Sequence, residues 1–304
     1  TLCKAMRDFR IDCVISENLL HGVLAFIFSG SGALKIFDFS DYFPESASIH
    51  YLESTSIIRG LINAIVLSIT KLSIRLSDVC IAPCRSLLRM IENIDDKKNA
   101  YLVTNGVDTR LFTPSKSRNY VRPENLVLSK NIITLVGLIE PWLELNTVIE
   151  GLRILHHKIN DVKLLLLGPR NGQYQEHIQH LIVKKCLEDQ VIWIDYVSHD
   201  VVPKYINMAK CCLMPFRTDL FLSSIVLPVK FFEYSACGKP VLSTPLPEIM
   251  ALNTEHALFY RNPTEFARNA ELLLCDEEVQ NKLSKKARSF AEKYDYTVLA
   301  KQLD

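Results

Sequence analysis

The chain has 304 residues, more than one compact core usually contains, and we therefore expect two α/β domains. Hydrophobic residues make up 48% of it, and 35 basic residues are almost balanced by 34 acidic ones. The near-zero net charge and the lack of a basic run exclude a nucleic-acid-binding protein that is held by phosphate contacts.

Short β-rich segments alternate with helical patterns along the chain, which is typical of parallel βαβ units. In the first third, the sequence predicts strands at 11–16, 34–38, 78–82 and 100–104. Residues 1–9 look like a helix that leads into the first strand. The strand and loop that should open a doubly wound domain are missing, so we predict an incomplete N-terminal domain over residues 1–112.

The longest apolar segment, residues 57–76, repeats its apolar positions at helical spacing and predicts a helix packed on a sheet. Arg59, Asn63, Lys71 and Arg75 within it argue against a membrane-spanning helix. Its cationic side leaves a peripheral contact with a membrane open as the alternative.

Nine cysteines lie mostly inside apolar runs, where a free thiol packs as a small hydrophobe. Cys80 and Cys84 have no second pair that would complete a metal site. We therefore expect a reducing cytoplasmic location, with the inner face of the cell membrane as a peripheral site.

Residues 113–129 carry prolines, serines and cations without apolar periodicity, which predicts an interdomain linker. The alternation then resumes, and residues 130–280 are predicted to form a complete Rossmann-like domain. Its strands are expected at 131–136, 162–167, 190–194, 211–214, 240–243 and 256–260, with helices at 143–157, 173–186, 200–209, 228–236 and 264–274. The tail from about residue 277 predicts one or two amphipathic helices.

Two glycines, Gly137 and Gly168, each follow the carboxyl end of a predicted strand. Ligands of open parallel sheets bind at this edge, where a residue without a side chain lets a phosphate or a sugar approach the backbone. Tight strand-to-helix turns also require glycine, so the pattern by itself favours neither explanation.

Residues 226–248 are the most informative segment. Pro228 suits the start of a helix and Gly238 suits its end, so that the N-terminus of the helix points to the ligand edge of the sheet. Lys230 in the first turn adds its charge to the positive end of the helix dipole, which suits a diphosphate. Glu233, one turn later, could accept hydrogen bonds from a ribose diol. A surface ion pair at i,i+3 spacing is the alternative, and spacing alone favours it.

The motif P-x-K-x-x-E-Y-x-A-x-G-K-P-V at 228–241 resembles the signature of the glycosyltransferase group 1 domain, found in family 4 retaining enzymes. Further segments that resemble this family are SDVCIAPCRSLL at 77–88, LVTNGVDTRLFTP at 102–114, VGLIEPW at 136–142 and LLLLGP at 164–169. The resemblance implies a GT-B fold, in which two Rossmann-like domains face a cleft. It also implies that residues 281–304 form helices that pack back toward the N-terminal domain.

By this resemblance, Glu233 binds the ribose hydroxyls and Lys230 contacts the diphosphate or the transferred sugar. The family often has a second glutamate where this chain has Ile225, and a cationic clamp where it has Leu138 and Leu143. Lys230 and Arg217 must then balance the diphosphate charge. Tyr196 and Val197 complete the donor-binding candidates, together with the two glycines.

Asp38 ends a predicted strand and Asp41 follows three residues later, where a carboxylate can bind acceptor hydroxyls or move a proton. Both are candidate catalytic residues, although capping of a following helix is an equal alternative for Asp41. His177 and His180 share a helical face without an evident third ligand, so we expect them to be solvated and predict no metal site.

The resulting hypothesis is a glycosyltransferase that moves a sugar, with retention, from a nucleotide-diphospho-sugar to a lipid-linked or polysaccharide acceptor of the cell envelope. The resemblance implies that no metal and no cofactor besides the donor is needed. Two alternatives are a nucleotide-sugar epimerase of GT-B fold and a non-catalytic nucleotide-sugar-binding module.

Overall fold

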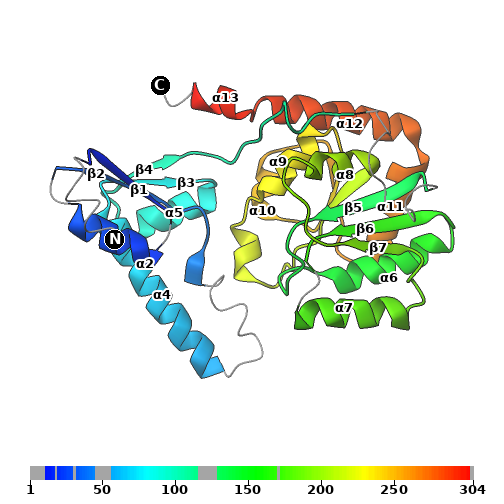
Figure 1. Cartoon of the computed structure of the whole chain (residues 1–304), viewed down its shortest axis with the longest axis horizontal. Helices are drawn as coiled ribbons and strands as arrows, with labels where there is room; N and C mark the ends of the chain where they lie inside the picture. Colours follow the sequence, from blue (N-terminus) through cyan, green and yellow to red (C-terminus); the bar gives the residue numbers. More distant parts are fainter. Residues whose placement is uncertain are drawn as a thin grey trace. The chain divides into compact units, whose positions relative to one another are not determined.

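The computed structural model describes residues 11–17, 19–29, 32–44, 56–115, 129–169 and 172–301. The chain divides into two compact units, the first formed by residues 1–104 and 220–227, the second by residues 105–219 and 228–304 (Figure 1). The second unit thus begins at Asn105, before the linker expected at 113–129, most of which lies outside the described residues. The helix expected at 1–9 lies outside them as well.

The first unit contains a four-stranded parallel sheet with the strands in sequence order. Its strands are β1 (Cys13–Ser16), β2 (Leu34–Asp38), β3 (Val79–Ala82) and β4 (Asn99–Leu102), as the sequence predicts to within about two residues at each end. The helices are α2 (Leu19–Phe28), α4 (Ser56–Leu76) and α5 (Arg85–Ile94). Phe26, Phe37 and Ile91 are buried in its core.

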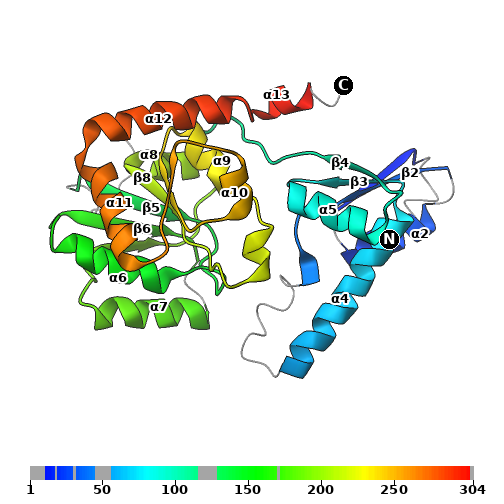
Figure 2. The same ribbon diagram turned by 180° about the vertical axis from the view of Figure 1, so that it is seen from behind.

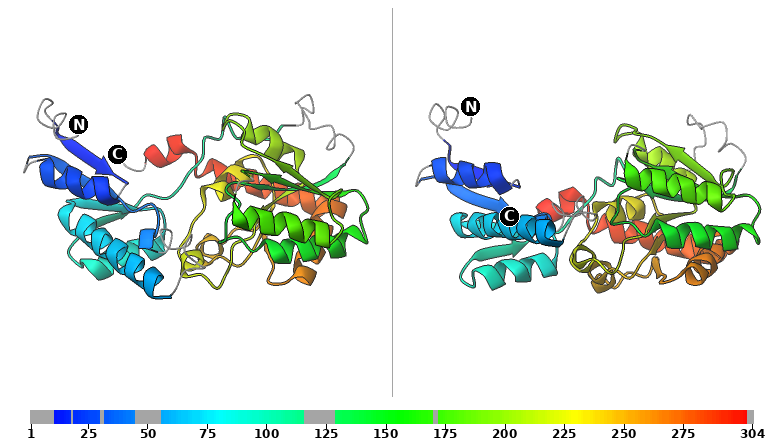
Figure 3. Two further views of the ribbon diagram at one scale, coloured as in Figure 1. Left: turned by 60° about the horizontal axis from the view of Figure 1, so that its bottom comes forward. Right: turned by 90° about the horizontal axis from the view of Figure 1, so that it is seen from below.

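Helix α4 is the long helix that the apolar periodicity predicts, and it packs beside α2 (Figure 3). Thr70, Ser73 and Ile74 near its end are buried, whereas Ile57 and Leu61 near its start are exposed. By length and composition alone, Ile57–Leu76 could cross a bilayer, and only 17% of its most apolar window is buried. The same composition occurs in core helices of soluble proteins.

The second unit contains a six-stranded, fully parallel sheet in the order β10-β9-β8-β5-β6-β7. Its strands are β5 (Asn131–Val136), β6 (Val162–Leu167), β7 (Val191–Ile194), β8 (Cys211–Met214), β9 (Val241–Ser243) and β10 (Ala257–Phe259). All six were predicted. The strand order reverses between β5 and β8, and open α/β sheets bind ligands at such a switch point.

Helices cover both faces of this sheet (Figures 1 and 2). Helix α6 (Leu145–His156) and α7 (Gln173–Lys184) lie on one face together with α11 (Pro263–Cys275), which packs on α6. Helices α8 (Val202–Met208) and α9 (Val229–Ala236) lie on the other. The short α10 (Pro247–Ala251) was not predicted. The apolar runs of β5 and β6 are buried between the layers, as expected for central parallel strands.

The tail forms α12 (Glu277–Glu292) and α13 (Tyr296–Ala300). Helix α12 packs on α9, and the segment before α13 returns to the Gly106–Thr109 region, where Val107 pairs with Asp295. A Cβ at Gly106 would lie 2.6 Å from Leu299 and 2.7 Å from the carbonyl oxygen of Tyr294, so this contact needs glycine. The sequence predicts an N-terminal domain over residues 1–112 and a tail, residues 281–304, that packs back toward it. Residues 105–112 and the tail instead belong to the same second unit, so the contact of the tail with Val107 lies within that unit.

Candidate functional site

Helix α9 has the boundaries that the sequence predicts. Pro228 has extended backbone angles and is the N-cap, and the helix starts at Val229. Gly238 ends it with a φ of +66°, a left-handed conformation that glycine adopts without strain. The first turn therefore carries Lys230, and the second turn carries Glu233 on the same face.

Glu233 is only 4% exposed. The Nζ of Lys230 lies 2.7 Å from its Oε2, and the Nε2 of His199 lies 3.4 Å from its Oε1. The ring of His199 also contacts the ring of Phe112, with the centroids 5.2 Å apart. The alternative interpretation of Lys230 and Glu233 was an ordinary surface ion pair, in which both side chains are solvated. The buried Glu233 carboxylate does not fit that interpretation.

A cavity of about 230 Å³ lies beyond the carboxyl ends of β5, β6 and β7. It brings together five of the seven predicted donor-binding residues: Gly137, Gly168, Tyr196, Val197 and Lys230. His199 lines it too, and Glu233 lies directly behind Lys230 and His199. An adjoining hollow of about 260 Å³ shares Gly137 and Lys230 and adds Trp142 and Pro228. Together they form a ligand-sized space at the β5/β8 switch point.

The two glycines are required for different reasons. Gly137 has a φ of +141°, and a Cβ built there would meet nothing within 4 Å, so its conformation is what excludes other residues. At Gly168, a Cβ would lie 2.0 Å from the carbonyl oxygen of Gly137. The two strand-to-loop turns thus pack backbone against backbone, which opens the floor of the cavity to a ligand.

Arg217 does not line this cavity. Its guanidinium forms two hydrogen bonds with the Asp219 carboxylate, at 3.1 Å and 2.6 Å, and lies in a separate hollow with Glu144 and Tyr174. The reason is local: a carboxylate two residues away offers a bidentate partner that a distant phosphate site cannot match.

Asp38 and Asp41 lie in the first unit. Asp38 ends β2, and its partial burial, together with the nearby Glu17 charge, raises the pKa of its carboxyl above the usual range. The Asp41 carboxylate accepts a hydrogen bond from the Tyr42 amide at 2.8 Å. A carboxyl group at a strand end with a raised pKa is suited to proton transfer.

Two residues of these sites were not singled out from the sequence. His199 follows β7 within the run YVSHD, and Glu17 directly follows β1. Both residues follow the carboxyl end of a predicted strand, and this position, which identified Asp38, could have identified them from the sequence. His177 and His180 are exposed, as expected; His177 lies 3.4 Å from Asn146 and stacks on Tyr174.

Comparisons with known proteins agree with this geometry. The family model described as glycosyl transferases group 1 matches residues 117–290, more than half of the chain. A Bacillus subtilis protein, TuaH, whose name assigns it to teichuronic acid biosynthesis as a glycosyltransferase, is 24% identical over 213 residues. That match covers 68% of this chain and 50% of TuaH, so the chain spans about half the length of this relative.

Solved structures show the same fold at low identity. Sucrose-phosphate synthase from Thermosynechococcus elongatus matches with a TM-score of 0.76 and 15% identity, over 99% of this chain and 75% of that one. Anabaena HepE, solved in complex with UDP and glucose, matches with a TM-score of 0.73 and 15% identity, over 99% and 79%. The likeness confirms the GT-B fold expected from the sequence.

Proposed function

The chain belongs to the glycosyl transferases group 1 family, and from this premise we propose that it transfers a sugar from a nucleotide-diphospho-sugar to an acceptor. The donor lies in the cavity of the second unit. The observation that carries this proposal is the buried Glu233 carboxylate, which contacts Lys230 and His199, two residues that line a cavity together with Gly137 and Gly168. The complex of Anabaena HepE with UDP and glucose supports a UDP-linked donor.

Each group in the cavity has a chemical role in this reaction. Departure of the nucleoside diphosphate builds negative charge on its outer phosphate, and Lys230 with the amides at the start of α9 stabilises that charge. Glu233 accepts hydrogen bonds from the ribose hydroxyls. The Gly137 amide already donates to Leu167 at 3.0 Å, so its contribution is space for the phosphates rather than a hydrogen bond.

The acceptor side of the proposal rests on the first unit. Asp38, with its raised pKa, handles the acceptor hydroxyl, and Asp41 assists in its binding. The acceptor is a lipid-linked or polymeric glycan of the cell envelope, in line with the role that the name of TuaH assigns to that relative. Transfer proceeds with retention of the anomeric configuration.

The test is calorimetric titration of UDP into the wild type and into Glu233→Ala and Asp38→Ala. We expect Glu233→Ala to lose about 1.5–3 kcal/mol of binding free energy, roughly tenfold or more in affinity, because a charge-assisted hydrogen bond is lost. Asp38→Ala should bind UDP like the wild type and lose sugar transfer. Glu188→Ala, an exposed position in the same unit, serves as the control.

Several outcomes would contradict the proposal. Equal binding of UDP by the wild type and Glu233→Ala would show that the carboxylate is structural. Turnover of UDP-sugar without any acceptor would favour the epimerase, and tight UDP binding without transfer or donor hydrolysis would favour the non-catalytic module. GDP and ADP titrated in parallel identify the nucleotide.

We also propose that transfer needs no metal ion or further cofactor, since the Lys230 cation and the α9 terminus supply the positive charge. Transfer rates should be unchanged after dialysis against EDTA. A rate that falls with EDTA and returns with Mg²⁺ or Mn²⁺ would overturn this part of the proposal.

The proposed location is the cytoplasmic face of the cell membrane. Helix α4 exposes Ile57, Leu61 and Ile65 together with the cations Lys71 and Arg75, a combination that suits an anionic lipid surface. The protein should co-sediment with vesicles that contain phosphatidylglycerol, and Lys71→Glu with Arg75→Glu should weaken this binding severalfold. Equal sedimentation of both proteins would exclude this surface as the contact.

A further inference from the structure

A second hollow of the C-terminal unit has no role in the proposed donor site. It consists of two connected spaces of about 410 Å³ and 300 Å³, which share Glu144 and Asp219 as lining residues. Neither space shares a lining residue with the donor cavity around Gly168 and Tyr196, although Leu143 and Phe216 also line the smaller hollow that adjoins that cavity. We propose that this hollow is a second carbohydrate-binding site, which takes a neutral saccharide unit.

The walls of the hollow are fixed by backbone contacts between two loops. The loop after β5 and the loop after β8 pair as an antiparallel bridge between Leu143 and Phe216. The Glu144 amide donates to the Pro215 carbonyl, and the Arg217 amide donates to the Trp142 carbonyl at 2.8 Å. Tyr174 on α7 donates a hydrogen bond from its hydroxyl to the carbonyl oxygen of Leu143. Preorganised walls lower the entropic cost of binding.

The polar side chains in the hollow alternate in charge. Glu144 caps α6 through Thr147, Arg217 is held by Asp219, and Arg261 lines the smaller space. Two carboxylates and two guanidinium groups leave no net charge. The hollow therefore offers both hydrogen-bond donors and acceptors without attracting an anion or a cation, and this mixture matches a polyhydroxylated ligand.

An independent observation points to a ligand in the smaller space. Tyr260 lines it, is 0% exposed, and its hydroxyl lacks a hydrogen-bond partner among the described residues. A buried hydroxyl without a partner is unfavourable and uncommon in folded proteins. The ring of Tyr260 is anchored by an edge-to-face contact with Phe266, with the centroids 5.2 Å apart. A saccharide hydroxyl would complete the hydrogen bonding of Tyr260.

The experiment measures binding of methyl α-glucoside, methyl α-galactoside and N-acetylglucosamine by saturation-transfer NMR, with saturating UDP present to fill the donor cavity. We expect at least one sugar to bind with UDP present. Tyr260→Phe should weaken it about fivefold, because one neutral hydrogen bond is lost, and Glu144→Gln about tenfold. Tyr101→Phe, at an exposed tyrosine of the first unit, is the matched control and should bind like the wild type.

Tyr260→Phe should also raise the melting temperature without sugar, since it removes the unpaired hydroxyl. This gain separates a ligand-binding role from a purely structural one. If the Tyr260 hydroxyl were only structural, Tyr260→Phe would lower both the melting temperature and the affinity for the sugar. Three results would overturn the inference: no sugar binding, unchanged affinity in Tyr260→Phe and Glu144→Gln, or displacement of the sugar by UDP. Because Tyr260 and Glu144 line this hollow and not the donor cavity, the two variants assign the bound sugar to the hollow even if UDP does not bind, so a failure of the proposed donor site leaves this test valid.

Discussion

At the scale of single residues, burial decides what a side chain can do. Glu233 and Lys230 have the spacing of an ordinary surface pair, but the carboxylate is buried and contacted from two elements. Gly137 and Gly168 have the same sequence context, yet one is required for its backbone conformation and the other for close packing.

Gly168→Ala should destabilise the second unit by about 1–3 kcal/mol, because the added methyl group meets the Gly137 carbonyl and the turn must shift. Thermal unfolding followed by circular dichroism measures this. Gly60→Ala, at a helical position where a Cβ meets nothing within 4 Å, is the control and should be neutral or stabilising. An unchanged melting temperature for Gly168→Ala would mean that the two turns do not pack as described.

Because of His256, we expect the stability of the second unit to depend on pH. It is buried, its ring nitrogen lies 2.8 Å from the Ser235 hydroxyl, and burial lowers its pKa from 6.5 to about 4. Because the unfolded state takes up the proton more readily, stability should fall as the pH drops from about 6.5 to about 4, by about 3 kcal/mol in total.

The measurement is the melting temperature of wild type and His256→Gln between pH 7 and pH 4. The variant should lose less stability over this range, although it starts lower. His180→Gln, at an exposed position, should follow the wild-type profile. Parallel profiles of the wild type and His256→Gln would show that other groups cause the acid sensitivity.

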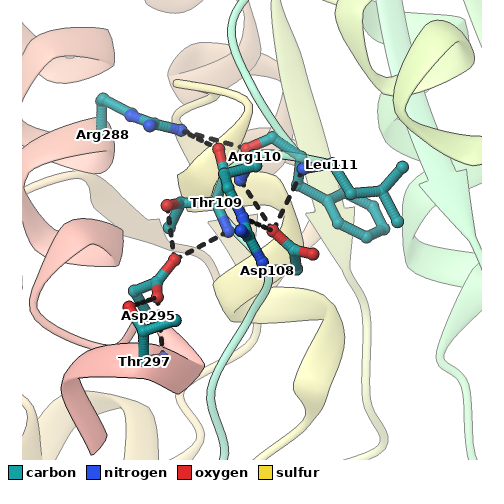
Figure 4. Close-up of polar contacts among 8 residues, drawn as sticks. Asp108, Thr109, Arg110, Leu111, Arg288, Asp295 and Thr297 are labelled. Atoms are coloured by element: carbon teal, nitrogen blue, oxygen red, sulfur yellow. Dashed lines mark hydrogen bonds and ion pairs between the residues drawn. The ribbon is translucent and has the colours of Figure 1, made fainter.

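At the scale of elements, the C-terminal helices are joined to the turn at residues 108–112 (Figure 4). Nη1 of Arg288 on α12 lies within hydrogen-bonding distance of the carbonyl oxygens of Thr109, Phe112 and Ala236. The Asp295 carboxylate accepts from Thr109 and Thr297, and these hydrogen bonds hold its pKa well below the usual range. One arginine thereby ties α12 to two separate segments.

Arg288→Lys should destabilise the second unit by about 1.5–3 kcal/mol, because the shorter lysine has one nitrogen and cannot contact these carbonyls and, as Nε of Arg288 does, the Glu292 carboxylate at the same time. Urea unfolding detects the loss. Arg268→Lys, at an exposed position on α11, provides the matched comparison and should change little. Equal urea midpoints for the two variants would mean that the contacts of Arg288 do not contribute to the stability of the second unit.

At the scale of the whole molecule, the two units have separate cores, and the proposed nucleotide site belongs to the second one. Both tryptophans of the chain, Trp142 and Trp193, are in that unit. Tryptophan fluorescence therefore reports the unfolding of the second unit, whereas circular dichroism reports both.

UDP at about 100 times its Kd should stabilise the second unit by about 2.7 kcal/mol and raise the fluorescence-detected melting temperature by several degrees. The part of the circular dichroism signal that belongs to the first unit should not move. In Glu233→Ala, the same UDP concentration should give a smaller shift. A shift of equal size in both signals would mean that the units unfold together.

Local pattern was enough to predict every strand of both sheets, the long helix α4, the helices of the second unit apart from α10, and the placement of Lys230 and Glu233 on one face of α9. Helices α2 and α5 of the first unit were not predicted. These features depend on periodicity and on caps such as Pro228 and Gly238, which act over a few residues. The family resemblance, carried by the motif at 228–241, added the GT-B fold and the hypothesis that Glu233 and Lys230 bind the donor.

Only the tertiary structure decided which distant residues meet. His199 reaches Glu233 across 34 positions, and Arg217 pairs with Asp219 and does not line the proposed donor cavity. The Tyr260 hydroxyl has no partner within the part of the chain that the structure describes, and it lies at a hollow that no motif marks. Residues 106–109 belong with the C-terminal helices for the same reason. Such contacts depend on how loops from separate strands pack at one sheet edge, and sequence spacing carries no information on that packing.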